Sequence, residues 1–228
     1  MNRVDNAMKK VYFSAYLFLF FPLIVMSNEF KTGAKIFSIH CVLCHGSKGM
    51  GEGFLPMKLA GYPPTNLLIT NKAKTRPEII KVISQGLENE DINEYMPPWE
   101  KELPEADIHN LADFIIYLRT DTDKALKLLK VMVGKLKKTN TDGKKIFNSR
   151  CVLCHGKNGE GDGRLGKIIK NPPPIDLTAS RVPADYLKMI IAKGGEGVGR
   201  SAQMPPWGDL MADNEITAVT EYILTIRD

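Results

Sequence analysis

The pentapeptide Cys-Val-Leu-Cys-His occurs twice in this chain of 228 residues, at positions 41–45 and again at positions 151–155. Two cysteines separated by two residues and followed directly by a histidine form the attachment signature of c-type haem. In such a site both thiols form thioether bonds to the porphyrin, and the imidazole binds the iron. The sequence therefore predicts two covalently bound haem c groups. The expected haem-binding residues are Cys41, Cys44, His45, Cys151, Cys154 and His155.

Other uses of a Cys-x-x-Cys pair fit this chain less well. A structural zinc site of this kind needs further soft ligands, and all four cysteines of the chain lie within the two pentapeptides. A redox-active dithiol of the thioredoxin type accompanies a βαβ unit, which the sequence does not indicate. No cysteine remains for a structural disulfide, so the cysteines do not indicate the cellular compartment.

The pentapeptides belong to a longer internal repeat. Gly33–Phe37 matches Gly143–Phe147 at an offset of 110 residues, and a Pro-Pro-x-(Asn/Asp)-Leu segment keeps that offset. From Gly86 and Gly194 onward the offset is 108, and it includes a Met-Pro-Pro-Trp segment in each half. Repeats of this length predict two small domains, which we place at residues 28–120 and 141–228.

The periodicity of both halves is helical. We expect a short helix around residues 36–37 and 146–147, a middle helix over residues 77–84 and 183–192, and a closing helix over residues 108–118 and 216–226. The closing segments carry apolar residues at a spacing near 3.6, which is typical of an amphipathic helix. No alternating strand pattern stands out, so the expected fold class is all-α.

A methionine lies in the same place of each half as a candidate distal ligand of the iron. Met96 follows His45 by 51 residues and Met204 follows His155 by 49. The two prolines after each methionine fix the backbone φ angle and would hold the methionine on a stiff loop. A methionine ligand is typical of an electron-transfer cytochrome with a raised potential. The alternative is a hydrophobic loop in which the methionine only fills space.

The other two histidines do not repeat. Arg150 stands where the first half has His40, and a threonine stands where the first half has His109. We expect packing or solvent-facing roles for both histidines.

The positive charge of the chain lies outside the repeats. The formal net charge of +5 divides into +2 for residues 1–27, −2 for residues 28–120, +4 for residues 121–140 and +1 for residues 141–228. A nucleic-acid partner is not expected, because it would require a basic face on a folded domain. Residues 121–140 instead read as a basic amphipathic helical connector, with a packing role between the domains preferred over a place on a membrane surface.

The first 27 residues have the composition of an export signal. Three basic residues precede an apolar run over residues 11–26, as in a signal peptide, and cleavage before Asn28 is one outcome. The other outcome is an uncleaved membrane anchor. Both predict a periplasmic location, either soluble or anchored to the outer face of the inner membrane.

Both halves resemble class I cytochromes c in their first helix, Cys-x-x-Cys-His motif, Pro-x-(Asn/Asp)-Leu loop, distal methionine and closing helix. The resemblance implies two such domains in tandem, with His45 and His155 as proximal ligands. It also implies distal ligation by Met96 and Met204. The resemblance further implies that a proline carbonyl accepts a hydrogen bond from each proximal imidazole, at Pro64 and Pro174 or at the neighbouring Pro63 and Pro173. It also implies that a glycine of the first helix packs against an aromatic residue of the closing helix, Gly33 against Phe114 and Gly143 against Tyr222.

These features predict an exported dihaem cytochrome that carries single electrons between redox partner proteins and is not itself an enzyme. Two alternatives remain open: a fixed haem subunit of a membrane oxidoreductase, and a dihaem peroxidase. The peroxidase would need an open iron site, whereas the sequence offers a methionine to both haems.

Overall fold

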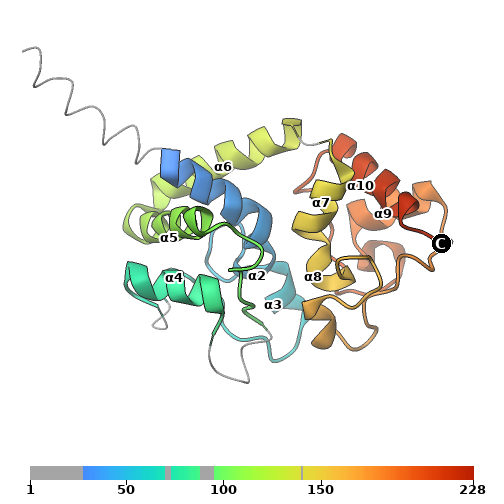
Figure 1. Cartoon of the computed structure of the whole chain (residues 1–228), viewed down its shortest axis with the longest axis horizontal. Helices are drawn as coiled ribbons and strands as arrows, with labels where there is room; N and C mark the ends of the chain where they lie inside the picture. Colours follow the sequence, from blue (N-terminus) through green and yellow to red (C-terminus); the bar gives the residue numbers. More distant parts are fainter. Residues whose placement is uncertain (1–27, 70–72, 88–94, 140) are drawn as a thin grey trace, which may run out of the picture.

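The computed structural model describes residues 28–69, 73–87, 95–139 and 141–228. Two helical domains lie side by side, and the long helix α6 (Thr122–Thr139) connects them along one edge (Figure 1). Within these ranges the regular structure is helical apart from one isolated bridge between Met50 and Asn66. No helix in this described part is both long and apolar enough to cross a membrane. The expected signal or anchor at residues 1–27 lies outside it.

The first domain contains the helices that the repeat predicts. Residues 28–40 are helical, and they lead into α2 (Val42–His45), α3 (Phe54–Lys58), α4 (Arg76–Gln85) and α5 (Glu105–Thr120). Helix α4 has a proline in its first turn and ends at Gly86, whose φ of 76° suits glycine. The predicted middle and closing helices of the first half are therefore confirmed.

The second domain repeats the same order. Its elements are α7 (Gly143–Arg150), α8 (Val152–His155), the 3-10 helix η1 (Arg164–Lys167), α9 (Ala184–Lys193), the 3-10 helix η2 (Glu196–Val198) and α10 (Asp213–Thr225). The predicted middle and closing helices of the second half correspond to α9 and α10. The α-helix α3 of the first domain is replaced by η1 in the second, directly after the segment that follows the pentapeptide.

In each domain the first helix crosses the closing helix at a glycine. A Cβ on Gly33 would meet the Asn110 carbonyl oxygen and would lie 2.6 Å from the Phe114 Cβ. A Cβ on Gly143 would meet the Ala218 carbonyl oxygen and would lie 2.9 Å from the Tyr222 Cβ. The glycines allow the two helices to approach closely, so both predicted glycine–aromatic contacts are confirmed.

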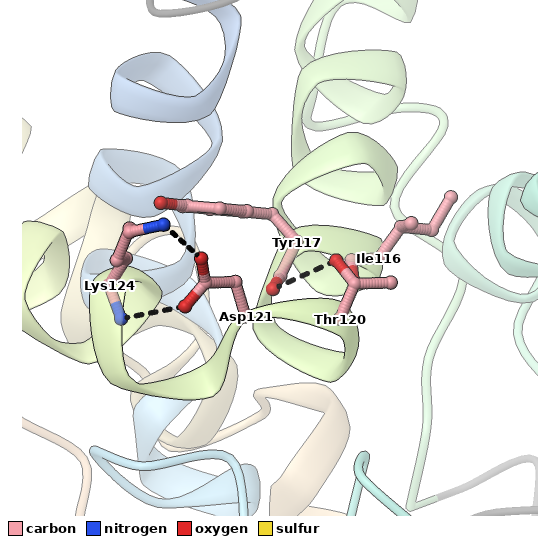
Figure 2. Close-up of polar contacts among 5 residues, drawn as sticks. All are labelled: Ile116, Tyr117, Thr120, Asp121 and Lys124. Carbon is pink, nitrogen blue, oxygen red and sulfur yellow. Dashed lines mark hydrogen bonds and ion pairs between the residues drawn. The ribbon is translucent and has the colours of Figure 1, made fainter.

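The connector α6 begins at Thr122, and Asp121 alone separates it from the end of α5 at Thr120 (Figure 2). The Asp121 side chain accepts hydrogen bonds from the Lys124 backbone N–H (3.4 Å) and from the Lys124 Nζ (2.7 Å), which stabilises the first turn of α6. Ala125 and Leu129 are buried in the core of the first domain. The described part of the apolar stripe of α6 thus extends the core of the first domain, which differs from the predicted packing between the two domains.

The two domains share an apolar interface around the pentapeptides. Leu43 and Leu55 belong to the first domain, yet they are buried within the core of the second. In return, Leu153 of the second pentapeptide packs against the cores of both domains. The helices that carry the haem attachment motifs, α2 and α8, therefore lie toward the interface (Figure 1).

Candidate haem sites

The first domain encloses a cavity that brings the predicted haem-binding residues together. Cys41, Cys44, His45 and Met96 all line it, with apolar side chains from α4 and α5 around them. With its open mouth included, the cavity measures about 930 Å³. Ligand cavities of about 300–1,000 Å³ are typical for small molecules and cofactors.

The second domain has the matching cavity, which is larger. Cys151, Cys154, His155 and Met204 line it, and its volume with the open mouth is about 1680 Å³. Leu43 of the first domain also lines this cavity, so the interface forms part of its wall. Each cavity thus joins two thiols, one imidazole and one thioether, which is the donor set that a covalently attached, six-coordinate haem requires.

Both proximal imidazoles are oriented by a backbone carbonyl. The Nδ1 of His45 lies 2.7 Å from the Thr65 carbonyl oxygen, and the Nδ1 of His155 lies 3.2 Å from the Ile175 carbonyl oxygen. A carbonyl only accepts hydrogen bonds, so each Nδ1 carries the proton and each Nε2 lone pair is available to an iron. Burial lowers the pKa of both histidines, which favours this neutral form.

The expectation that proline carbonyls would accept these hydrogen bonds is wrong by one residue. The acceptors are Thr65 and Ile175, which directly follow Pro64 and Pro174. Proline supplies rigidity on one side of the acceptor instead of supplying the acceptor itself. The Thr65 hydroxyl also donates to the Cys44 carbonyl oxygen (2.8 Å), which ties this loop to the attachment helix α2.

The four thiols are held in apolar surroundings. Burial raises the pKa of Cys41 well above its ordinary value, and burial together with Cys154 raises the pKa of Cys151 to about 12. These thiols are therefore neutral at pH 7, and they line the cavity walls where the edge of a porphyrin would lie.

The Met-Pro-Pro-Trp segments are fixed through their tryptophans. The backbone N–H of Trp99 donates to the Ile83 carbonyl oxygen, and that of Trp207 donates to the Ile191 carbonyl oxygen, each at 3.0 Å. Both indole rings are buried. Each segment is thereby tied to the last turn of α4 or α9, and its methionine lines the cavity.

His40 and Arg150 occupy equivalent positions of the repeat, and each contacts the tryptophan of its own domain. The His40 ring stacks edge-on against Trp99 at 5.3 Å, and the Arg150 guanidinium lies 5.7 Å from the centre of the Trp207 ring. Burial, and to a lesser extent the charge of Arg150, lowers the pKa of His40 to about 4. The packing role expected for His40 is confirmed. His109 is partly exposed, with its Nε2 4.0 Å from Glu105.

The attachment sites of the two domains approach each other across the interface. Burial, and to a lesser extent the neighbouring Cys44, raises the pKa of Cys154 to about 12, and both cysteines pack against the core of the second domain. The Tyr62 hydroxyl donates to the Cys44 sulfur at 3.2 Å, and the charge of Cys154 also acts on Tyr62. Cys44, an attachment residue of the first domain, therefore lies at the interface with the second domain.

Sequence reasoning did not find Tyr62, Arg150 or Arg164 as residues of the sites. None of them repeats: Pro172, His40 and Phe54 stand at the corresponding positions of the other half. A search for repeated residues necessarily misses contacts in which one domain completes the other. These residues could have been found by looking for charged or aromatic side chains at positions where the two halves of the repeat differ.

Comparison with protein families identifies both halves. The family model described as "Cytochrome C oxidase, cbb3-type, subunit III" matches twice, at residues 28–115 and 138–223. The chain belongs to this family. It consists of two class I cytochrome c domains in tandem, and it binds two covalent haem c groups.

The curated relatives have the same kind of name. A cbb3-type cytochrome c oxidase subunit FixP of Azorhizobium caulinodans is 28% identical over 201 residues, which is 85% of this chain and 58% of the relative. A cbb3-type cytochrome c oxidase subunit CcoP of Azospirillum brasilense is 23% identical over 201 residues, which is 84% of this chain and 60% of the relative. The chain thus spans about three-fifths of the length of these relatives.

A chain from the Kuenenia stuttgartiensis reducing HAO-like protein complex is 19% identical, with 86% of this chain and 96% of that chain covered. Its TM-score of 0.32 is too low to support a structural argument.

The family match shows an electron-transfer cytochrome with two haems. It favours the alternative of a fixed oxidase subunit over that of a freely diffusing carrier.

Proposed function

We propose that this protein is a haem c subunit of a cbb3-type oxidase complex that passes single electrons between its two haems. The observation that carries the proposal is the pair of matching cavities, each lined by two cysteines, one histidine and one methionine. Haem c supplies reversible one-electron chemistry when it is bound. The protein attaches, orients and shields it.

In this proposal Cys41 and Cys44 attach the first haem, with His45 and Met96 as its axial ligands. Cys151 and Cys154 attach the second haem, and His155 and Met204 are its axial ligands. The carbonyls of Thr65 and Ile175 keep the two imidazoles in the coordinating tautomer. An iron bound by His45 and Met96, or by His155 and Met204, would have no position open to a substrate, and its haem would supply one-electron transfer.

The interface supports transfer between the two haems. Leu43 and Leu55 of the first domain are buried in the core of the second, Cys44 and Cys154 both pack against that core, and the Tyr62 hydroxyl donates to the Cys44 sulfur. An apolar interface would limit solvent reorganisation and would favour electron transfer between haems bound in the two cavities. We infer that the domains act as one relay.

The relatives' names support a fixed place in an oxidase, with a donor on one side and the oxidase core on the other. We further propose domain limits of 28–120 and 141–228 with a connector at 121–140. The location we propose is the periplasmic side of the inner membrane, held there by the assembly or by the N-terminal apolar segment. About two-fifths of the length of each relative has no counterpart in this chain, and the proposal does not extend to what that part of the relatives does.

Two experiments test the proposal. Ferric spectra should show the weak methionine-sulfur-to-iron band at an intensity for two haems, and Met96→Ala and Met204→Ala should each remove half of it. A high-spin haem that binds peroxide readily would instead support a peroxidase. Affinity isolation from gently solubilised membranes should recover the protein with a cbb3-type oxidase. Recovery only as a free protein in the soluble fraction would contradict the subunit role.

A further inference from the structure

Arg164 of the second domain holds the distal loop of the first. It is the first residue of η1, and its Nη1 donates to the Pro98 carbonyl oxygen at 2.9 Å. Its Nη2 lies 3.2 Å from the Glu102 carboxylate, and its guanidinium carbon lies 5.9 Å from the centre of the Trp99 ring. One side chain therefore contacts three residues of the segment that follows Met96.

This segment has few ways of holding itself. Pro97 and Pro98 have no backbone N–H, so the loop has no donor of its own between Met96 and Trp99. Trp99 is tied to α4, but the Pro98 carbonyl, two residues from the methionine, is held by Arg164. The planar guanidinium presents several donors at fixed angles, and it can therefore bind the carbonyl and the carboxylate at once.

The second domain holds its own loop with backbone hydrogen bonds. The Gly195 N–H donates to the Met204 carbonyl oxygen (3.0 Å), and the Met204 N–H donates to the Ser201 carbonyl oxygen (3.2 Å). Phe54 stands where the second domain has Arg164, and it packs against the core of the second domain. The nearest ionic contact in the reverse direction joins Lys58 to Glu196, eight residues before Met204.

We propose that Arg164 is a positioning residue for the first haem, and that it keeps the Met96 sulfur at the iron. Docking of the second domain thereby stabilises the axial ligation of the first. This inference rests on the proposed function, because it takes Met96 as the distal ligand. Methionine sulfur binds iron weakly, so the free energy needed to open its loop governs how easily a small ligand displaces it.

The test measures displacement of methionine in the full-length dihaem protein. Ferric protein carrying Met204→His is titrated with imidazole, so that the remaining sulfur-to-iron band reports the first haem alone. Loss of a charge-assisted hydrogen bond at a half-exposed site should raise the apparent imidazole affinity of this haem about tenfold in Arg164→Leu. Arg164→Lys keeps the charge without the fork and should give a smaller rise.

Lys58→Met is the matched control, because it breaks an ionic contact at the same interface away from Met96. It should leave the imidazole affinity of the first haem within about twofold of the parent. The proposal is overturned if Arg164→Leu also stays within that range, or if Lys58→Met produces the same rise. Should Arg164→Leu fail to accumulate, Arg164→Gln gives the same decision, because it also lacks the charge.

The failure of the proposed ligand is distinguishable from the failure of this inference. Met96→Ala in the same background should abolish the band before any imidazole is added. A band that survives Met96→Ala contradicts the ligand assignment itself. A band that is lost in Met96→Ala but titrates normally in Arg164→Leu contradicts only the role of Arg164.

Discussion

The two domains share one plan for holding a haem but differ in the contacts around the methionine that we propose as the distal ligand. In the second domain, backbone hydrogen bonds at Met204 hold the methionine within its own loop. In the first, Arg164 reaches across the interface to hold Pro98 and Glu102. The cofactor cavities are thus products of the repeat, whereas the contacts that join the domains come from residues in which the two copies differ.

This difference shows how a duplicated domain becomes part of a single unit. The helix crossings, the histidine–carbonyl contacts and the tryptophan hydrogen bonds are the same in both copies. Three equivalent positions instead hold different residues: Phe54 and Arg164, His40 and Arg150, and Tyr62 and Pro172. All of these except Pro172 take part in contacts at or near the interface. Four sets of substitutions test this division, in order of decreasing expected effect.

The largest effect should come from the shared helix crossing. Gly33→Val and Gly143→Val would each place a side chain against a backbone carbonyl of the closing helix. Each should destabilise its own domain by more than about 4 kcal/mol, because neither helix can move away without losing its packing. Chemical denaturation followed by circular dichroism measures the loss.

Gly134→Ala is the control for these substitutions, since a Cβ there meets no atom within 4 Å. It should leave the protein as stable as before or stabilise it by up to about 1 kcal/mol, because alanine is the better helix former. Tolerance of valine at Gly33 but not at Gly143 would contradict the equivalence of the two crossings.

The next effect tests the shared core. Leu55 and Leu165 occupy equivalent positions of the repeat, yet both are buried in the core of the second domain. Leu55→Ala and Leu165→Ala should each lower the free energy of unfolding by about 2–5 kcal/mol. Hydrogen exchange should show that Leu55→Ala loosens α9 and α10 of the second domain.

The exposed Met57, two residues along α3, provides the comparison for Leu55. Met57→Ala should change the stability by less than about 0.5 kcal/mol, because its side chain is 67% exposed. If Leu55→Ala loosened only the first domain, the shared core would be refuted.

The third effect is the pH dependence that comes from His40, which has no counterpart histidine in the second domain. Because the pKa of His40 is about 4 in the folded protein and near 6.5 when it is exposed, the folded state binds fewer protons. Its contribution to stability is therefore present above pH 6.5 and is lost as the pH falls from 6.5 to 4. The loss amounts to at most about 3 kcal/mol.

His40→Phe keeps an aromatic contact with Trp99 and should flatten the stability profile between pH 6.5 and 4, as measured by denaturation at each pH. His109→Gln should retain the slope of the parent, because His109 is partly exposed. A parent slope unchanged by His40→Phe would show that His40 is not the group responsible.

The smallest effect is expected at the ionic contact between Lys58 and Glu196. The Glu196 side chain is 66% exposed, so solvent screens the pair. Glu196→Gln should lower the free energy of unfolding by less than about 1 kcal/mol, and the difference should shrink as salt is added. A larger and salt-independent loss would mean that polar contacts hold the domains together more than the buried leucines do.

Much of the fold followed from the sequence because it depended on local rules. Apolar spacing predicted α5 and α10, and a proline near the start with a glycine just past the end predicted α4 and α9. The small size of Gly33 and Gly143 matched the close helix crossings. The predicted acceptors of the histidine hydrogen bonds were wrong by one residue, because two prolines in succession do not determine which of the neighbouring carbonyls faces the imidazole. The interface could not be predicted, since burial of Leu43 and Leu55 depends on how two separate domains dock.

The sequence predicted the residues that line the two cavities, but not the residues of the other domain that hold them in place. The pentapeptides and the repeated Met-Pro-Pro-Trp segments marked the groups that line each cavity. Arg164 carried no such mark, because its partners lie 62 to 66 residues away and on the other domain. Long-range contacts of this kind leave no periodic pattern in a single sequence.

The measurement closest to the central claim is the rate of electron transfer between the two haems of one molecule. In the Met204→His variant the second haem should have the lower potential, so an electron placed on either haem by pulse radiolysis should settle on the first. We expect this redistribution to proceed at a rate that does not depend on protein concentration, because Cys44 and Cys154 lie across a shared interface. Redistribution whose rate rises in proportion to protein concentration would show that the haems exchange electrons only between molecules, and it would contradict the proposed relay.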